Sequence, residues 1–150
     1  MKARDNPRPL RRVAAEPITL EGWGLFTESL MFELGFLAGD EVELTILRNR
    51  LWRAARVILD VSLHTGRMGI RQAVDFLVDR VRFERSAAEL EVGMYPRRPT
   101  YVLGYLIGMQ EIERLRDDWV AANGPPNPPS TLYDALLSAG GIPPALIRAE

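Results

Sequence analysis

Five side chains that could do chemistry recur along one segment at steps of three or four residues. They are Asn49, Arg53, Arg56, Asp60 and His64. At 100° per residue of an α-helix, they fall within one stripe about 80° wide. The rest of the segment from Leu51 to Leu63 is almost wholly apolar, which is typical of a helix buried on nearly every side. Because unpaired buried charges are costly, the stripe must face either a network of partners or a water-filled cleft.

Two interpretations of this stripe stay open on its own sequence. In the first, the stripe is a solvated face that carries an Arg56–Asp60 ion pair four residues apart. In the second, it lines a site, where an arginine could hold a carboxylate through two parallel hydrogen bonds. Two further segments with carboxylates and phenols favour the second interpretation.

The first of these segments places two carboxylates and two glycines near the start of an expected helix. Glu21 and Glu28 are seven residues apart and therefore share a helix face. Gly22 and Gly24 each cost a helix about 1 kcal/mol relative to alanine, which suggests that a backbone or a ligand comes close there. The helix dipole would by itself favour Glu21 at a helix start, but it does not account for Glu28 or for the glycines.

The second segment pairs phenols with glycines. Tyr101 and Tyr105 are four residues apart, and Gly104 and Gly108 repeat at the same interval beside them. Small residues at that spacing allow two helices to approach closely, while the phenols can donate hydrogen bonds or lie half-buried in packing. Tyr95 adds a third phenol nearby in the sequence.

The elements that must position these residues are all expected to be helices. No useful run of alternating apolar and polar residues indicates a strand. We expect an all-α fold with a single helical domain of five to seven helices over residues 18–150, preceded by an extended arm over residues 1–17. The expected helices span about 20–37, 40–64, 70–82, 86–94 and 100–122, followed by a pair of short helices from Ser130 that Gly140-Gly141 interrupts. A stiff, proline-rich connector is expected at residues 124–129.

Composition excludes several classes of function. The chain has 150 residues, a net charge of −1, one histidine and no cysteine. This charge does not suit a nucleic-acid partner, and the absence of cysteine excludes disulfides, thiolate metal sites and a thiol nucleophile. No apolar run is long enough for a membrane span, and residues 1–12 do not form a signal peptide, so the cytoplasm is the default compartment.

The same motifs resemble a known bacterial family, the domain of unknown function 885. Residues 21–28 (EGWGLFTE) resemble its EGWALYxE signature, and residues 53–64 (RAARVILDVSLH) are similar to its RAxRLVVDTGLH segment. Gln72-Ala73, Glu91-Val92, residues 99–108 (PTYVLGYLIG) and the Leu136-to-Pro144 stretch follow in the family's order. The resemblance covers about Pro17 to Ile147.

The resemblance implies the C-terminal part of a zincin-like zinc metallopeptidase. It implies Glu21 as a metal ligand, with Glu28 orienting another ligand. It implies that His64, Tyr101 and Tyr105 stabilise an oxyanion or grip a peptide. Arg53 or Arg56 would then hold a substrate carboxylate, with Asp60 fixing the other arginine.

The family's metal-binding helix, with a pattern like HExxPGHH, precedes EGW and is absent from this chain. We therefore expect no zinc and no peptidase activity from this chain alone, and zinc only if an upstream segment or a partner completes the site. Three hypotheses follow: a metallopeptidase-like segment that is inactive alone, a non-catalytic helical binding or assembly module, and one half of a split metallopeptidase completed by an upstream-encoded partner chain. The missing helix also predicts an exposed apolar face beside Trp23 and Leu25, through which the chain would self-associate or bind that partner.

Overall fold

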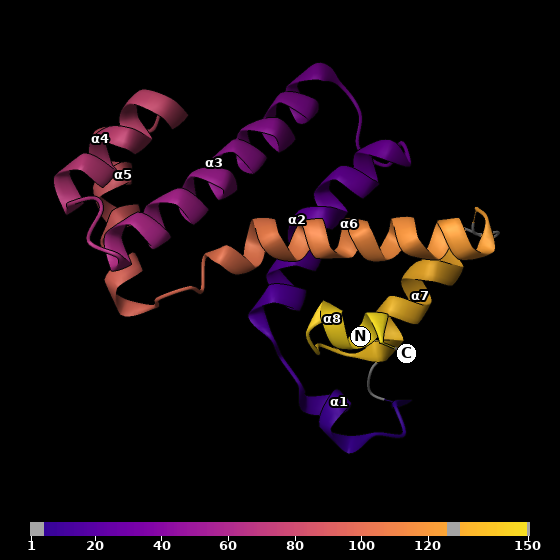
Figure 1. Cartoon of the computed structure of the whole chain (residues 1–150). Coiled ribbons are helices and arrows are strands. Elements are labelled where there is room, and N and C mark those ends of the chain that lie inside the picture. Colours follow the sequence, from indigo (N-terminus) through magenta and orange to yellow (C-terminus); the bar gives the residue numbers. More distant parts are fainter. Residues whose placement is uncertain (1–4, 126–129, 150) are drawn as a thin grey trace.

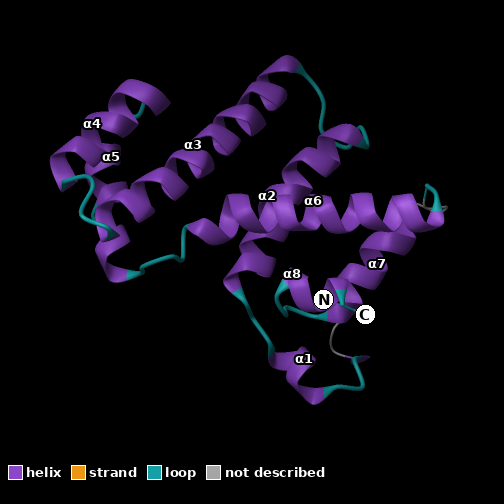
Figure 2. Ribbon diagram, viewed as in Figure 1, coloured by secondary structure: helices purple, strands orange, loops and turns teal. Residues whose placement is uncertain are grey.

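The computed structural model describes residues 5–125 and 130–149. Over these ranges the chain forms helices joined by short loops, with no strand (Figures 1 and 2). The helices are α1 (Pro9–Val13), α2 (Pro17–Glu33), α3 (Asp40–His64), α4 (Ile70–Val81), α5 (Arg85–Val92), the short 3-10 helix η2 (Tyr95–Arg97), α6 (Leu103–Asn123), α7 (Ser130–Ala139) and α8 (Pro144–Arg148). The expected all-α fold is confirmed, and α3 has the bounds expected for it.

The main difference in helix content lies before α2. The segment expected to be an extended arm contains α1, so the described residues hold eight α-helices where five to seven were expected. The segment is also held in place: the Glu16 N–H donates to the Gly141 carbonyl at 2.8 Å, and the Asn6 amide donates to the Ser138 carbonyl at 2.8 Å. Residues 1–4 of the expected arm and residues 126–129 of the expected proline-rich connector lie outside the described residues.

Helices α2 and α6 cross at close range because glycines line the contact (Figure 1). A Cβ atom at Gly108 would collide with the Ile18 carbonyl oxygen of α2, and one at Gly22 would collide with the Gly108 backbone. A Cβ at Gly104 would lie 3.1 Å from the Pro17 carbonyl oxygen. The glycine spacing therefore predicted a real helix contact, whereas Gly24 has open space around it and no role in that contact.

The apolar core forms two clusters. The first joins the C-terminal half of α3 to α4, α5 and the residues around η2, and its fully enclosed members include Leu59, Leu77 and Tyr95. The second lies between α2 and α6 and includes Leu25 and Ile112, with α7 packed against it. Helix α3 runs from the end of α2 to α4 and α5 (Figure 1). Its Arg56 lies over Trp52, which packs on the first cluster, and over Tyr105, which packs on the second. No helix in the described ranges is long and apolar enough to cross a membrane.

Candidate functional site

Glu91 of α5 is the acceptor at the centre of the polar network on α3. Its side chain takes two hydrogen bonds from Arg56, at 2.6 Å from Nε and 3.0 Å from Nη2. The Trp52 indole N–H donates to it at 3.2 Å, and the Tyr95 hydroxyl donates at 3.0 Å. Both members of the Arg56–Glu91 pair are buried, with side chains 8% and 6% exposed. Such a two-pronged pair fixes the arginine plane and satisfies both charges.

The pKa values in this network reflect the balance between burial and charge. Burial disfavours the charged form of Arg56, but the hydrogen bonds and negative charge of Glu91 outweigh it and raise the Arg56 pKa. Burial, followed by the charge of Glu91, raises the pKa of the Tyr95 hydroxyl far above its ordinary value. The guanidinium therefore stays charged and the Tyr95 phenol stays neutral at any physiological pH.

Asp60 does not hold an arginine, and the prediction that it would is wrong. Its Oδ2 atom accepts the Thr100 N–H at 3.0 Å, next to a backbone turn in which Thr100 has a φ of 68°. The His64 Nδ1 lies 2.8 Å from the Asp60 carbonyl oxygen, an atom that can only accept, so this nitrogen carries the hydrogen. The solvated Arg56–Asp60 pair is equally wrong, because both side chains are buried and Arg56 pairs with Glu91.

Among the cations of the stripe, Arg53 has buried N–H groups that donate no hydrogen bond to any described residue. Its Nε and Nη1 atoms are buried and have no hydrogen-bond partner within the described residues. The guanidinium carbon lies 4.0 Å from the centre of the Trp52 ring and 5.6 Å from that of Tyr105. Burial, and then the nearby charge of Arg56, lowers the Arg53 pKa. Two aromatic faces stabilise this cation, while its buried Nε and Nη1 atoms have no acceptor within the described residues.

Glu21 and Tyr101 meet across the crossing of α2 and α6. The Tyr101 hydroxyl donates a short hydrogen bond to Glu21 Oε1. This bond, with a smaller contribution from burial, raises the Tyr101 pKa to about 12. The Tyr101 and Tyr105 rings lie edge to face with centroids 6.2 Å apart. Glu28, two turns along α2 from Glu21, accepts a hydrogen bond from the Asn49 amide at 3.1 Å.

A hollow of about 460 Å³ lies beside these groups. The residues that line it are Arg56, Met94, Arg97, Arg98, Tyr101, Val102 and Tyr105. It therefore combines arginine cations with two phenols, a lining that suits an anionic ligand with hydrogen-bond acceptors.

The structure brings together only part of the predicted site. Arg56, Tyr101 and Tyr105 line the hollow, and Glu21 joins it through its bond to Tyr101. Arg53, Asp60 and His64 are not among the lining residues, so the hollow holds fewer of the predicted site residues than expected. Sequence reasoning missed the part played by Glu91, whose only signal was its place in the resemblance to the family.

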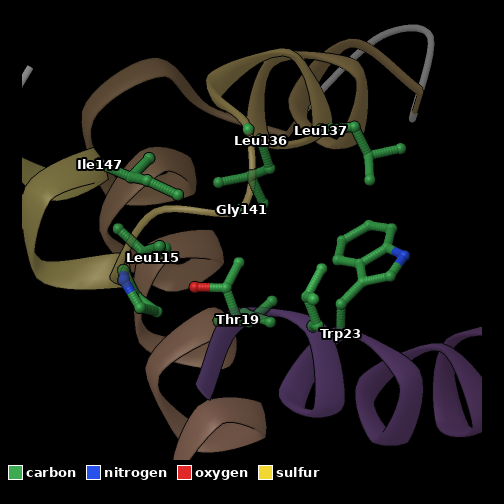
Figure 3. A pocket seen from close by; sticks show the side chains of 11 residues that line it. Thr19, Trp23, Leu115, Leu136, Leu137, Gly141 and Ile147 are labelled. Carbon is green, nitrogen blue, oxygen red and sulfur yellow. The ribbon is translucent and has the colours of Figure 1, made fainter. Parts of the chain in front are cut away.

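A second, apolar pocket accounts for the surroundings of Trp23. Side chains from α2, α6, α7 and α8 and the turn at Gly141 surround a space of about 50 Å³ beside the indole (Figure 3). None of its lining residues is ionisable, so it offers no acid–base or metal chemistry. Trp23 is half-buried against Phe26 and Tyr133, and Leu25 is 2% exposed. The expected apolar face beside Trp23 and Leu25 is therefore not open, because the C-terminal helices pack over it.

The described residues hold no group of three or more histidine, aspartate or glutamate side chains that could bind a metal ion. Glu21, the predicted ligand, is engaged with Tyr101. A catalytic zinc ion needs three well-placed protein ligands, so these residues alone do not fit one.

Comparison with known proteins places the chain in a family. No curated protein matches it. A solved structure, described as "the putative lipoprotein from Colwellia psychrerythraea", matches with a TM-score of 0.86 and 31% sequence identity. The match covers 93% of this chain but 24% of the Colwellia chain, so this chain spans about a quarter of the length of that protein. The sequence profile of the family described as "Bacterial protein of unknown function (DUF885)" matches residues 1–150, and the chain therefore belongs to the DUF885 family.

Proposed function

We propose that this chain is the C-terminal, substrate-binding segment of a metallopeptidase-like hydrolase, and that it is inactive alone. The observation that carries this proposal is the hollow lined by Arg56, Tyr101 and Tyr105, with the under-used guanidinium of Arg53 on the same helix. A guanidinium with free N–H groups between aromatic faces is suited to the carboxylate of a peptide-like substrate.

Each residue of the stripe has a distinct proposed part. Arg56 lines the hollow, is held by Glu91 and supplies a fixed positive field there. Arg53, three residues earlier on α3 and outside the lining, is the cation that binds the substrate carboxylate, because its Nε and Nη1 atoms have no partner of their own within the described residues. Tyr105 donates a hydrogen bond to a substrate oxygen, and Tyr101 does so once its single hydroxyl hydrogen leaves Glu21. Asp60 fixes the turn at Thr100. Of the residues predicted to be catalytic, His64 has the weakest support, because it does not line the hollow.

Zinc enters this proposal only if residues from an upstream segment or a partner chain complete its site. Glu21 would contribute one carboxylate, and the remaining ligands would come from an upstream segment or from a partner chain. No catalytic step is assigned to the metal here, because the donors present do not build its site.

Zinc retention and peptide cleavage test the proposal together. The pure chain is incubated with one equivalent of zinc, freed of unbound metal and assayed against a peptide library, alone and after addition of the remainder of a DUF885 polypeptide. We expect no cleavage by the chain alone and cleavage by the completed protein. Glu21→Gln should abolish that cleavage, whereas Glu89→Gln, an exposed carboxylate on α5, should leave it unchanged.

If the chain alone retained one equivalent of zinc and cleaved peptides, and if Glu21→Gln abolished both, the proposal that the chain is inactive alone would be wrong. Cleavage by the completed protein that survives Glu21→Gln would remove Glu21 from the metal site.

One alternative function has an observation in its favour. Apart from Arg53, the buried charges on α3 have partners within the described residues, as expected of a helical binding or assembly module that never held a metal. Peptide binding without cleavage by the completed protein would favour that module.

The Colwellia protein's description as a lipoprotein does not support a cytoplasmic location, which fractionation of the native cells into soluble and membrane parts would test.

A further inference from the structure

Helix α3 carries an apolar stripe that nothing in the described part of the chain covers. It consists of Leu44, Leu47, Leu51, Ile58 and Val61, whose exposed fractions lie between 40% and 68%. At 100° per residue these five side chains fall within about 100° of the helix circumference, on the side away from the buried Ile46, Arg56 and Asp60. An apolar stripe of this length on one helix is typical of a helix packed on both sides.

Two neighbouring features extend this stripe and give it polarity. Phe36, in the turn before α3, is a further large apolar side chain that is 77% exposed. The first turn of α3 adds two exposed carboxylates on the same side of the helix, Asp40 and Glu43. The surface is therefore apolar along its length and acidic at one end.

The length of the Colwellia protein indicates what covers this surface. This chain matches about a quarter of that protein, and 93% of this chain takes part in the match. The other three quarters of such a polypeptide are long enough to supply an element that covers this surface. The side of α2 beside Trp23 is already covered by α7 and α8, whereas the outer side of α3 is open.

We propose that the outer stripe of α3 is the docking surface for the remainder of the family's longer polypeptide. The contacting element is an amphipathic helix, because an i, i+3, i+7 stripe on one helix is best filled by the side-chain ridges of another. Its apolar side faces Leu47, Leu51 and Ile58, and basic side chains at one of its ends face the acidic first turn of α3. This proposal rests on the proposed function in one respect: it takes the chain to be one segment of a larger protein.

Thiol labelling tests this directly, because the chain contains no cysteine. Leu51→Cys is made in the isolated chain and in a chimera in which this chain replaces the matched quarter of the Colwellia protein. Labelling rates at the introduced cysteine are followed by peptide mass spectrometry. Leu90→Cys is the matched control, since Leu90 is a 77% exposed leucine on α5, away from the stripe.

We expect labelling at position 51 to slow by about ten-fold or more in the chimera, and labelling at position 90 to change little. An unchanged rate at position 51 would overturn the proposal. Slower labelling at position 51 as the isolated chain is concentrated would assign the stripe to a second copy of the chain, and would also overturn it.

A second measurement avoids dependence on the folding of the chimera. The chain is co-expressed with the tagged remaining three quarters of the Colwellia protein, and the amount that co-purifies is measured. The double variant Leu51→Lys/Ile58→Lys should lose most of this binding, and Leu90→Lys should keep it. Equal binding by both variants, or no binding of the natural sequence, contradicts the proposal. Because neither measurement uses substrate or metal, docking can succeed even if the proposed hydrolase activity fails.

Discussion

At the scale of single residues, the stripe on α3 has three kinds of partner. Arg56 pairs with a carboxylate from another helix, Asp60 accepts a backbone N–H and faces His64, and Arg53 lies against two aromatic rings. A charge that is paired inside the fold stabilises it, whereas a charge with free N–H groups is the one that can recognise a ligand. The two arginines therefore differ in their partners although they are three residues apart.

Removing Glu91 is expected to destabilise the fold strongly. In Glu91→Ala the buried Arg56 loses both of its hydrogen bonds, and the loss is expected to be about 3–5 kcal/mol of unfolding free energy. Urea unfolding measures it, with Glu89→Ala on the exposed side of α5 as the control, expected within about 0.5 kcal/mol of the natural sequence. The double variant Arg56→Met/Glu91→Leu should recover much of the loss, since it leaves no buried charge unpaired.

The bond between Tyr101 and Glu21 is expected to show in the alkaline titration of the chain. The neutral phenol donates to the carboxylate, which raises the Tyr101 pKa from its ordinary value of 10.0 to about 12. The stabilisation by this bond is thus fully present below pH 10 and is lost as the pH rises through about 12. Near-ultraviolet phenolate absorbance measures the titration, and Tyr101→Phe identifies the late-titrating phenol. Glu21→Gln should lower the pKa of that phenol. An unchanged titration midpoint would show that Glu21 does not raise the Tyr101 pKa.

At the scale of the elements, the crossing of α2 and α6 depends on glycine at some positions and not at others. In Gly108→Ala the new methyl group meets the Ile18 carbonyl, so the helices must move apart, at a cost of about 1–3 kcal/mol. Gly24→Ala meets open space on the same pair of helices and should stabilise the chain by up to about 1 kcal/mol through helix propensity. Thermal unfolding of the two variants should shift in opposite directions. If both variants shifted the unfolding temperature in the same direction, α2 and α6 would not be in close contact at Gly108.

The helices were largely predictable from sequence, and their arrangement was not. Gly39 and Thr65-Gly66 bound the apolar run of α3, and both ends of that helix follow from them. The glycine spacing predicted a close contact, which proved to join α2 to α6. Glu91 was missed as a partner of Arg56 because the period of one helix does not indicate which other helix its side chains meet. The cover over Trp23 was missed for the same reason, since α7 and α8 return to α2 from far along the chain.

At the scale of the whole molecule, α3 connects two core clusters, since it belongs to the one with α4 and α5 and contacts α2 and α6, which form the other. Trp52 reports on the cluster around α4 and α5, and Trp23 on the cluster between α2 and α6. Because α4 and α5 are short and join the rest mainly through α3, we expect their cluster to unfold first. Variants that keep one tryptophan each, with Trp119 also replaced by Phe, measure the two transitions by fluorescence in urea. Coincident midpoints would instead indicate a single cooperative unit.

The docking of the first segment against the last has a consequence for how the chain is made. The Thr19 hydroxyl and the Ile142 carbonyl that it bonds are 123 residues apart. At a synthesis rate of about 5–20 residues per second, the N-terminal partner leaves the ribosome roughly 6–25 s before the C-terminal one exists. Throughout that interval α1 and the start of α2 have nothing to pack against on this side. This contact is therefore among the last to form on the ribosome. Until it forms, the start of α2 is positioned by its crossing with α6.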